Sequence, residues 1–166
     1  MQQWSDWFDR HGPALLLLAR RWSSNQADAE DAVQAAFLKF WPQRERVADP
    51  VAYLFGCVRH AAIDAARRRE SRQRRDEQAG RAYADHRSEA DQFQSRVEAD
   101  DRRRTIEAAL GELPAEQAAV LTMKIWGQLT HKQIAEATET AEGTVASRYR
   151  YALQGLRSRL DRELLT

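Results

Sequence analysis

Apolar residues recur along most of the chain at the three- and four-residue intervals of amphipathic helices. The stretch 28–41 is the clearest case. Its apolar stripe consists of Ala29, Val33, Ala36, Phe37, Phe40 and Trp41. Alternating runs of β-branched residues are absent, and glycine and proline are scarce. The pattern therefore predicts an all-α protein without a sheet.

Breaks in this periodicity divide the amino-terminal part into four predicted helices. Trp4, Trp7 and Phe8 share the face of a short first helix, which Gly12-Pro13 is expected to end. The other three are expected over about residues 14–22 and 28–41 and from residue 51 onward, into an arginine cluster at 67–75. Four such helices can bury a common core, so residues 1–72 are predicted to form a first domain.

The composition then changes. From residue 76 to 96, Tyr83 and Phe93 are the only large apolar side chains, and both charge signs are mixed. Such a segment cannot bury enough surface to fold alone, which makes residues 73–96 a predicted flexible linker. Regularly spaced apolar residues resume at Val97, and residues 97–166 are predicted to form a second domain.

The second domain ends in the pattern of a helix-turn-helix reader. Thr130 to Gln133 has the form of a capping box, residues 139–141 form the turn, and the last helix is expected over about residues 142–160. With its apolar stripe packed inward, that helix exposes side chains able to bond phosphates and base edges: Thr144, Ser147, Arg148, Arg150, Tyr151 and Gln154. A helical hairpin with a merely charged surface would show a similar pattern.

Charge supports a nucleic-acid partner. The net charge of +1 conceals a separation of acidic and basic residues along the chain. Nearly all basic residues are arginine, which suits bidentate phosphate and base contacts. The run Leu15–Ala19 is too short to span a membrane, and no signal peptide is evident. A lone cysteine, Cys57, excludes an internal disulfide. We therefore expect a cytoplasmic protein with no membrane insertion of its own.

Enzyme signatures are missing from the sequence. Its four histidines lack cysteine or carboxylate neighbours at metal-ligand spacing, and no glycine-rich phosphate loop or nucleophile elbow occurs. The expectation is a protein that is not an enzyme and uses no metal or cofactor.

The polar face of the helix at 28–41 is unusually acidic. It carries Asp28, Asp31, Gln34 and Leu38, with Glu30 beside them. Acidic residues in a first turn are favoured by the helix dipole, so ordinary capping explains part of the pattern. In a chain otherwise rich in arginine, an acidic and partly apolar face indicates a protein partner.

Together these segments resemble the extracytoplasmic-function (ECF) sigma factors, in their minimal two-domain form, over nearly the whole chain. Residues 28–41 are similar to the region-two helix of that family. The segments 50–54 and 59–64, running into the arginines, are similar to its minus-ten part. Leu113-Pro114 and the segments 133–136 and 143–148 are similar to region four. The resemblance implies an initiation factor that binds core RNA polymerase and directs it to specific promoters.

The resemblance also implies a role for each site residue. The β′ clamp helices of polymerase would be bound by Asp28, Glu30, Asp31, Gln34 and Leu38. The melted minus-ten strand would be held by Arg59, His60, Asp64, Arg67 and Arg68. The minus-thirty-five duplex would be read by Thr144, Ser147, Arg148, Arg150 and Tyr151. The implied partners are polymerase, including its β flap, promoter DNA and an inhibitory anti-sigma factor.

Several positions depart from the family pattern. His60 stands where asparagine is usual, and Glu139 occupies the usual turn glycine. Ala146 and Tyr151 replace residues that are commonly basic. Two alternatives stay open at this point: a stand-alone helix-turn-helix regulator, and an interaction adaptor that has lost promoter reading.

Overall fold

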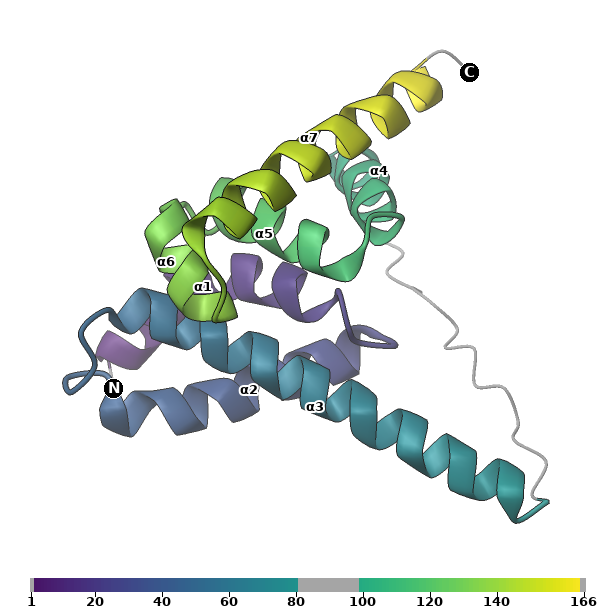
Figure 1. Cartoon of the computed structure of the whole chain (residues 1–166). Helices are drawn as coiled ribbons and strands as arrows, with labels where there is room; N and C mark the ends of the chain where they lie inside the picture. Colours follow the sequence, from purple (N-terminus) through teal and green to yellow (C-terminus); the bar gives the residue numbers. More distant parts are fainter. Residues whose placement is uncertain (1, 81–98, 165–166) are drawn as a thin grey trace.

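The structure is a computed structural model that describes residues 2–80 and 99–164 (Figure 1). All regular structure in these ranges is helical, which confirms the all-α prediction. The elements are α1 (Gln2–Ala19), α2 (Gln26–Phe40), the 3₁₀ helix η1 (Trp41–Gln43), α3 (Pro50–Gln78), α4 (Ala99–Gly111), α5 (Ala115–Ile125), α6 (His131–Thr138) and α7 (Glu142–Leu164). The start of the predicted linker continues α3 to Gln78, and the linker from residue 81 on lies outside the described residues.

The predicted break at Gly12-Pro13 is wrong, because α1 runs through Pro13 without interruption. Proline inside a helix removes one hydrogen bond and costs about 3 kcal/mol or more. The apolar residues on both sides of Pro13 offset this cost because they enter one core. Trp7 packs on Phe40 with ring centroids 5.1 Å apart, and Leu15 is fully buried about two turns further along.

Helices α1, α2 and α3 form the first module. The Asn25 side chain caps α2 by accepting a 2.8 Å hydrogen bond from the backbone N–H of Asp28. The stripe predicted for α2 is buried from Ala29 to Phe40, and only its last member, Trp41, is partly exposed. Helix α3 begins at Pro50 behind the N-cap Asp49 and buries Leu54, Phe55, Val58 and Ala62, as the sequence pattern indicates.

Helices α4 to α7 form the second module. Its own cluster of buried side chains comprises Ala109, Leu110, Leu113, Ala118, Leu121, Ala152 and Leu156. The predicted capping box is present: the Gln133 N–H donates to Thr130 Oγ1 at 3.1 Å, and the Thr130 N–H donates to Gln133 Oε1 at 2.9 Å. The turn between α6 and α7 contains Glu139 in a left-handed conformation, with φ of 55°.

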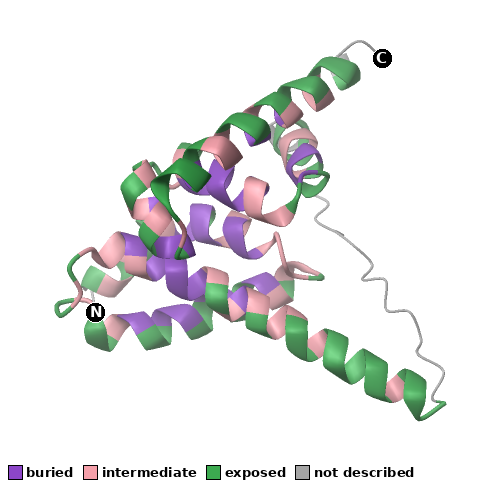
Figure 2. Ribbon diagram, in the orientation of Figure 1, coloured by how far each residue is buried: buried purple, intermediate pink, exposed green. Residues whose placement is uncertain are grey.

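The two modules pack against each other and share one core. Helix α6 lies on α3, and α5 lies on α1 (Figures 1 and 2). The second module contributes seven buried residues to the core of α1–α3: Ala119, Val120, Met123, Leu129, Ile134, Ala137 and Val145. Among the described helices, none is long and apolar enough to cross a membrane.

Candidate functional site

The predicted polymerase-binding residues lie along the outer face of α2. Glu30, Asp31 and Gln34 are exposed, and Leu38 is 65% exposed although it is a large apolar residue. We call these four side chains the acidic face. An exposed leucine beside two carboxylates is the composition expected of a surface that a partner covers.

Asp28 differs from the other four because its carboxylate is bound by a side chain of another helix. Arg69 Nη1 donates to Asp28 Oδ2 at 3.2 Å, and Arg69 Nη2 donates to the Trp22 carbonyl at 2.6 Å. These bonds fasten α3 to the start of α2. No sequence signal distinguishes Arg69 from its neighbours, since it lies inside a run of arginines.

A groove of about 450 Å³ separates the acidic face from the exposed side of α3. Charged side chains of both signs line it together with the His60 ring: Asp31, Lys39, Asp64, Arg68 and Arg72. The structure therefore brings predicted polymerase-binding and predicted minus-ten residues to opposite walls of one groove. Sequence reasoning placed them on separate helices and did not predict the groove.

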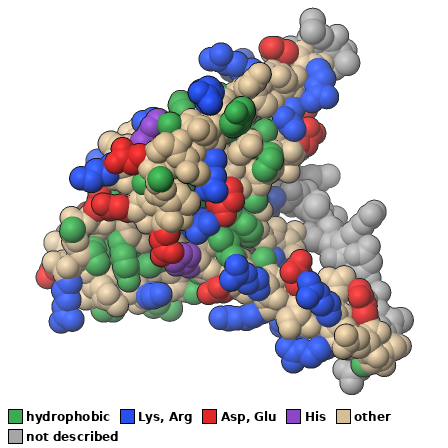
Figure 3. Space-filling view, in the orientation of Figure 1, with side chains coloured by type: hydrophobic (Ala, Val, Ile, Leu, Met, Phe, Trp, Pro, Cys, Tyr) green, Lys and Arg blue, Asp and Glu red, His purple; other side chains and the backbone are tan. Residues whose placement is uncertain are grey.

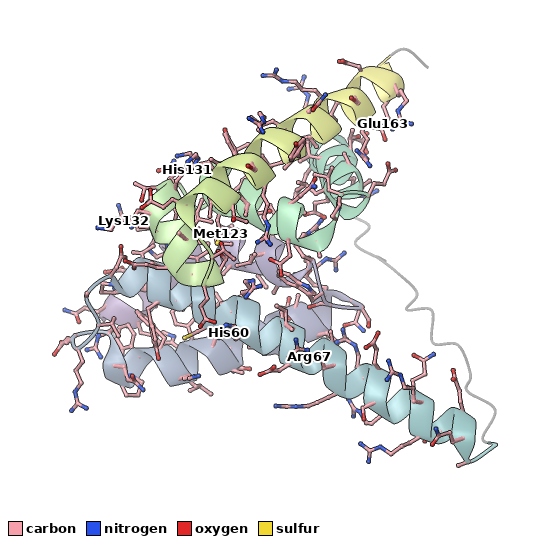
Figure 4. All side chains as sticks on the ribbon, in the orientation of Figure 1. His60, Arg67, Met123, His131, Lys132 and Glu163 are labelled. Atoms are coloured by element: carbon pink, nitrogen blue, oxygen red, sulfur yellow. The ribbon has the colours of Figure 1, made fainter. Side chains whose placement is uncertain are left out.

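The predicted minus-ten residues divide into two groups along α3. Asp64, Arg67 and Arg68 are exposed, and Figure 3 shows Lys and Arg side chains gathered along the projecting part of α3. Arg59 is directed toward the second module, and its side chain retains 13% exposure. His60 lies where the turn before α7 approaches α3, with Nε2 3.7 Å from Glu139 Oε1 (Figure 4).

The predicted minus-thirty-five residues lie on the outer side of α7, with one exception. Thr144, Arg150 and Tyr151 are exposed, and the Arg150 guanidinium lies 5.3 Å from the centroid of the Tyr151 ring. Ser147 is half-buried. Arg148 is directed inward, and its side chain is 29% exposed.

Glu116, in the first turn of α5, links the two predicted DNA-reading surfaces. Its Oε1 accepts a 2.6 Å hydrogen bond from Arg59 Nη2, and its Oε2 lies 3.9 Å from Arg148 Nη1. Sequence reasoning missed Glu116. Its spacing from either arginine carries no local signal, since 57 positions separate it from Arg59.

Cys57 and His11 are among the groups of the first module whose pKa values are shifted. Burial raises the pKa of the Cys57 thiol, and a hydrogen bond with Tyr53 and the charge of Lys39 partly oppose this shift. Burial, helped by nearby Arg10, lowers the pKa of His11. Within residues 2–80 and 99–164, no three His, Cys, Asp or Glu side chains are grouped so as to hold a metal ion.

Comparison with known proteins gives a family for both modules. The sigma-70 region 2 model matches residues 7–72, and the sigma-70 region 4 model matches residues 103–156. The chain is 33% identical to the ECF RNA polymerase sigma factor SigL of Mycobacterium tuberculosis over 162 residues, which cover 93% of this chain and 86% of SigL. It is 28% identical to SigK of Mycobacterium ulcerans, over 80% of this chain and 72% of SigK.

Two solved structures are similar in fold over 97% of the chain, each at 22% identity. The sigma factor RpoE of Bartonella quintana, in complex with the anti-sigma factor NepR, matches over 98% of its own chain with a TM-score of 0.68. CnrH, in complex with the cytosolic domain of CnrY, matches over 90% of its own chain with a TM-score of 0.62.

Proposed function

The chain belongs to the ECF sigma factors, which direct RNA polymerase to promoters, and we propose which of its residues perform each part of that task. The observation that carries the proposal is the groove between α2 and α3, where an exposed acidic face meets exposed arginines. A sigma factor must hold polymerase and the opened DNA strand side by side, and the groove offers Asp31 on its α2 wall and Arg68 and Arg72 on its α3 wall.

We assign polymerase binding to the acidic face. Glu30 and Asp31 supply the charge, and Leu38 supplies apolar area at the far end of the same helix. The basic partner would be the β′ clamp helices. Asp28 acts indirectly in this proposal, since its bond to Arg69 fixes the angle between α2 and α3.

We assign the minus-ten strand to α3. Arg67 and Arg68 are exposed and free to approach phosphates, and Asp64 lies beside them on the groove wall. His60 offers a half-exposed ring that can stack on an unpaired base, a contact available to every base type. Arg59 joins this set once it is released from Glu116.

We assign the minus-thirty-five duplex to the amino-terminal half of α7. Thr144, Arg150 and Tyr151 reach solvent there, and Ser147 and Arg148 lie at the edge of the same surface. Arg148 in particular can bond a base edge in two places, so Arg148→Ala would weaken promoter recognition by about 1–3 kcal/mol. The remainder of the second module is available to the polymerase β flap.

We also propose an anti-sigma partner. Of the two solved structures described above, one is a complex of a sigma factor with an anti-sigma factor, and the other is a complex of CnrH with the cytosolic domain of CnrY. A partner of this kind would cover the acidic face or the exposed side of α7. As a subunit of polymerase, the chain would work in the cytoplasm.

The experiment that tests this assignment is charge reversal on the acidic face. Asp31→Arg should abolish co-elution with core polymerase and core-dependent run-off transcription, while the circular dichroism spectrum and melting temperature stay those of the wild type. Asp101→Arg is the matched control, because Asp101 is an exposed acid on α4, outside the face. Normal polymerase binding by Asp31→Arg would refute the assignment of this face.

A further inference from the structure

We propose that the free chain inhibits itself, because its second module closes over α3 and holds Arg59 and Arg148 away from DNA through Glu116. The inference rests on the functions proposed above for the two arginines. It concerns the resting state of the chain and the step that must precede promoter reading.

Glu116 is the centre of the closed state. One carboxylate oxygen accepts a hydrogen bond from Arg59 at 2.6 Å, and the other faces Arg148 at 3.9 Å. The two arginines come from different modules and are assigned to different promoter elements. A single carboxylate therefore occupies the guanidinium groups that would otherwise meet phosphates or base edges in both places.

Three further contacts hold the modules together around this centre. The Gln133 side chain donates to Asp49 at 3.0 Å, and His60 approaches Glu139 at 3.7 Å. The backbones also come close: a Cβ atom added to Gly56 would lie 3.2 Å from the Ala137 carbonyl oxygen. We call the contacts of Glu116, Gln133, Glu139 and Ala137 with the first module the clasp.

The closed state cannot read a whole promoter. By their positions, the minus-ten and minus-thirty-five elements lie about 25 base pairs apart, which is about 85 Å at 3.4 Å per base pair. His60, assigned to the first element, lies 3.7 Å from Glu139, which is in the turn before the helix assigned to the second. The modules must therefore separate before both elements can be bound at once.

The polar part of the clasp is incomplete, which makes it suited to release. Arg59 Nε, Glu116 Oε2 and Arg148 Nη1 are buried atoms without a hydrogen-bond partner in the closed state. A buried polar atom without a partner opposes the arrangement that buries it. Binding DNA phosphates would give the two guanidinium groups the partners that Glu116 supplies only in part.

Apolar packing between the modules keeps the free chain closed. Opening would expose core residues of both modules to water, among them Phe55 and Met123, the second of which is labelled in Figure 4. The acidic face stays exposed in the closed state, since none of its four residues takes part in the clasp. Polymerase can therefore bind α2 of the closed chain first, and the second module is released afterwards.

Two variants test the clasp by different means. Glu116→Gln removes the charge that holds the arginines, and Glu112→Gln is its matched control, because Glu112 is a nearby glutamate that pairs with Arg159 inside the second module. Gly56→Gln forces a side chain against Ala137 without changing charge. Its control is Gly111→Gln, at a glycine with nothing within 4 Å of an added Cβ.

Each variant is measured in the full chain by two readouts. The first is the distance between spin labels on Gln73→Cys and Arg157→Cys, exposed positions of α3 and α7, in a Cys57→Ser background. The second is the affinity of the free chain for a random-sequence 25-base-pair duplex and a random 20-nucleotide single strand. If about one chain in ten is open at rest, full opening raises these affinities about tenfold, since apparent affinity scales with the competent fraction.

We expect Glu116→Gln and Gly56→Gln to lengthen the label distance and to raise both affinities above those of their controls. Unchanged distances in both variants would overturn the clasp, and longer distances without a gain in affinity would overturn its inhibitory role. Failure of the proposed function would be seen in a different experiment. Asp31→Arg would then bind polymerase as the wild type does, whatever the label distances in the clasp variants.

Discussion

The side-chain amide of Gln133 donates a 3.0 Å hydrogen bond to Asp49 Oδ2, and so joins the first turns of α6 and α3, 84 positions apart. Each partner also caps its own helix. Asp49 Oδ1 accepts from the Ala52 N–H at 3.0 Å, and Gln133 Oε1 accepts from the Thr130 N–H at 2.9 Å. The pair therefore couples the start of each helix to the contact between the modules.

Gln133→Glu should separate these two roles. Glutamate keeps the capping box of α6 but has no donor for Asp49, and it places two carboxylates against each other. We expect helix content to be unchanged and the modules to open, which the label distance between α3 and α7 would report. Gln43→Glu adds the same charge at the exposed end of η1 and should leave the distance unchanged. Equal distances in both variants would show that the bond is dispensable for closure.

Glu139→Gly should stabilise the protein. Glu139 ends α6 with φ of 55°, a conformation that costs a residue with a side chain about 1–2 kcal/mol and costs glycine little. Part of this gain is lost because glycine is freer in the unfolded chain, so we expect about 0.5–1 kcal/mol more stability in urea unfolding. The pair with His60 is exposed and contributes little. Glu136→Gly, within α6, should instead destabilise by about 1 kcal/mol.

Arg68 and Arg69 are neighbours in sequence and should differ in their contribution to the free energy of unfolding. Arg69→Ala removes the bonds to Asp28 and the Trp22 carbonyl, so we expect a loss of about 1 kcal/mol in the free energy of unfolding. Arg68 is exposed on the groove wall, and Arg68→Ala should leave stability within about 0.5 kcal/mol of the wild type. Denaturant midpoints for the two variants would decide this, and equal midpoints would contradict the structural role of Arg69.

Cys57 should react slowly with thiol reagents. Burial raises the pKa of its thiol, so less of the reactive thiolate is present at a given pH than in the unfolded chain. Ellman's reagent at mildly alkaline pH should modify the native protein more slowly than the urea-unfolded protein. Tyr53→Phe removes the hydrogen bond that lowers this pKa, so it should slow the reaction further. An unchanged rate in that variant would show that Tyr53 does not influence the thiolate.

His11 should make stability depend on pH. Burial lowers the pKa of its imidazole below the usual 6.5, so the unfolded chain takes up this proton at a higher pH than the folded chain. Its contribution to stability is therefore full above pH 6.5 and is lost as the pH falls below that value. His11→Phe keeps a ring between Trp7 and Phe55 and removes the titration. The urea midpoint should fall more for the wild type than for this variant between about pH 7.5 and about pH 5.5.

Much of the fold follows from short-range signals in the sequence. The stripe of α2, the capping box at Thr130 and the end of α6 at Thr138 each depend on residues within one or two turns of one another, and each is as predicted. The exception is Pro13, where a local helix breaker is overridden by the core into which both halves of α1 pack. Local rules could not reveal that core.

The candidate site was less accessible to sequence reasoning. Exposure of Asp31 and Arg150 follows from the apolar stripe on the opposite side of each helix. The inward positions of Arg59 and Arg148 could not be predicted in this way. Both result from contacts between the modules, and these contacts produce no periodic pattern in the sequence. Glu116 was missed for that reason, and the roles assigned to all these residues stay predictions until the variants are measured.

The far end of α3 is built differently from the rest of the fold. Past Arg72 it buries no side chain and is supported by exposed contacts between successive turns, such as the 3.4 Å bond from Gln73 to Glu77. The arginines crowded on this end of α3 repel one another. Anions that bind them weaken this repulsion and so make this arm of the helix more rigid. A nucleic acid bound along this arm would therefore stabilise the helix that it touches, and its affinity would fall steeply as the salt concentration rises.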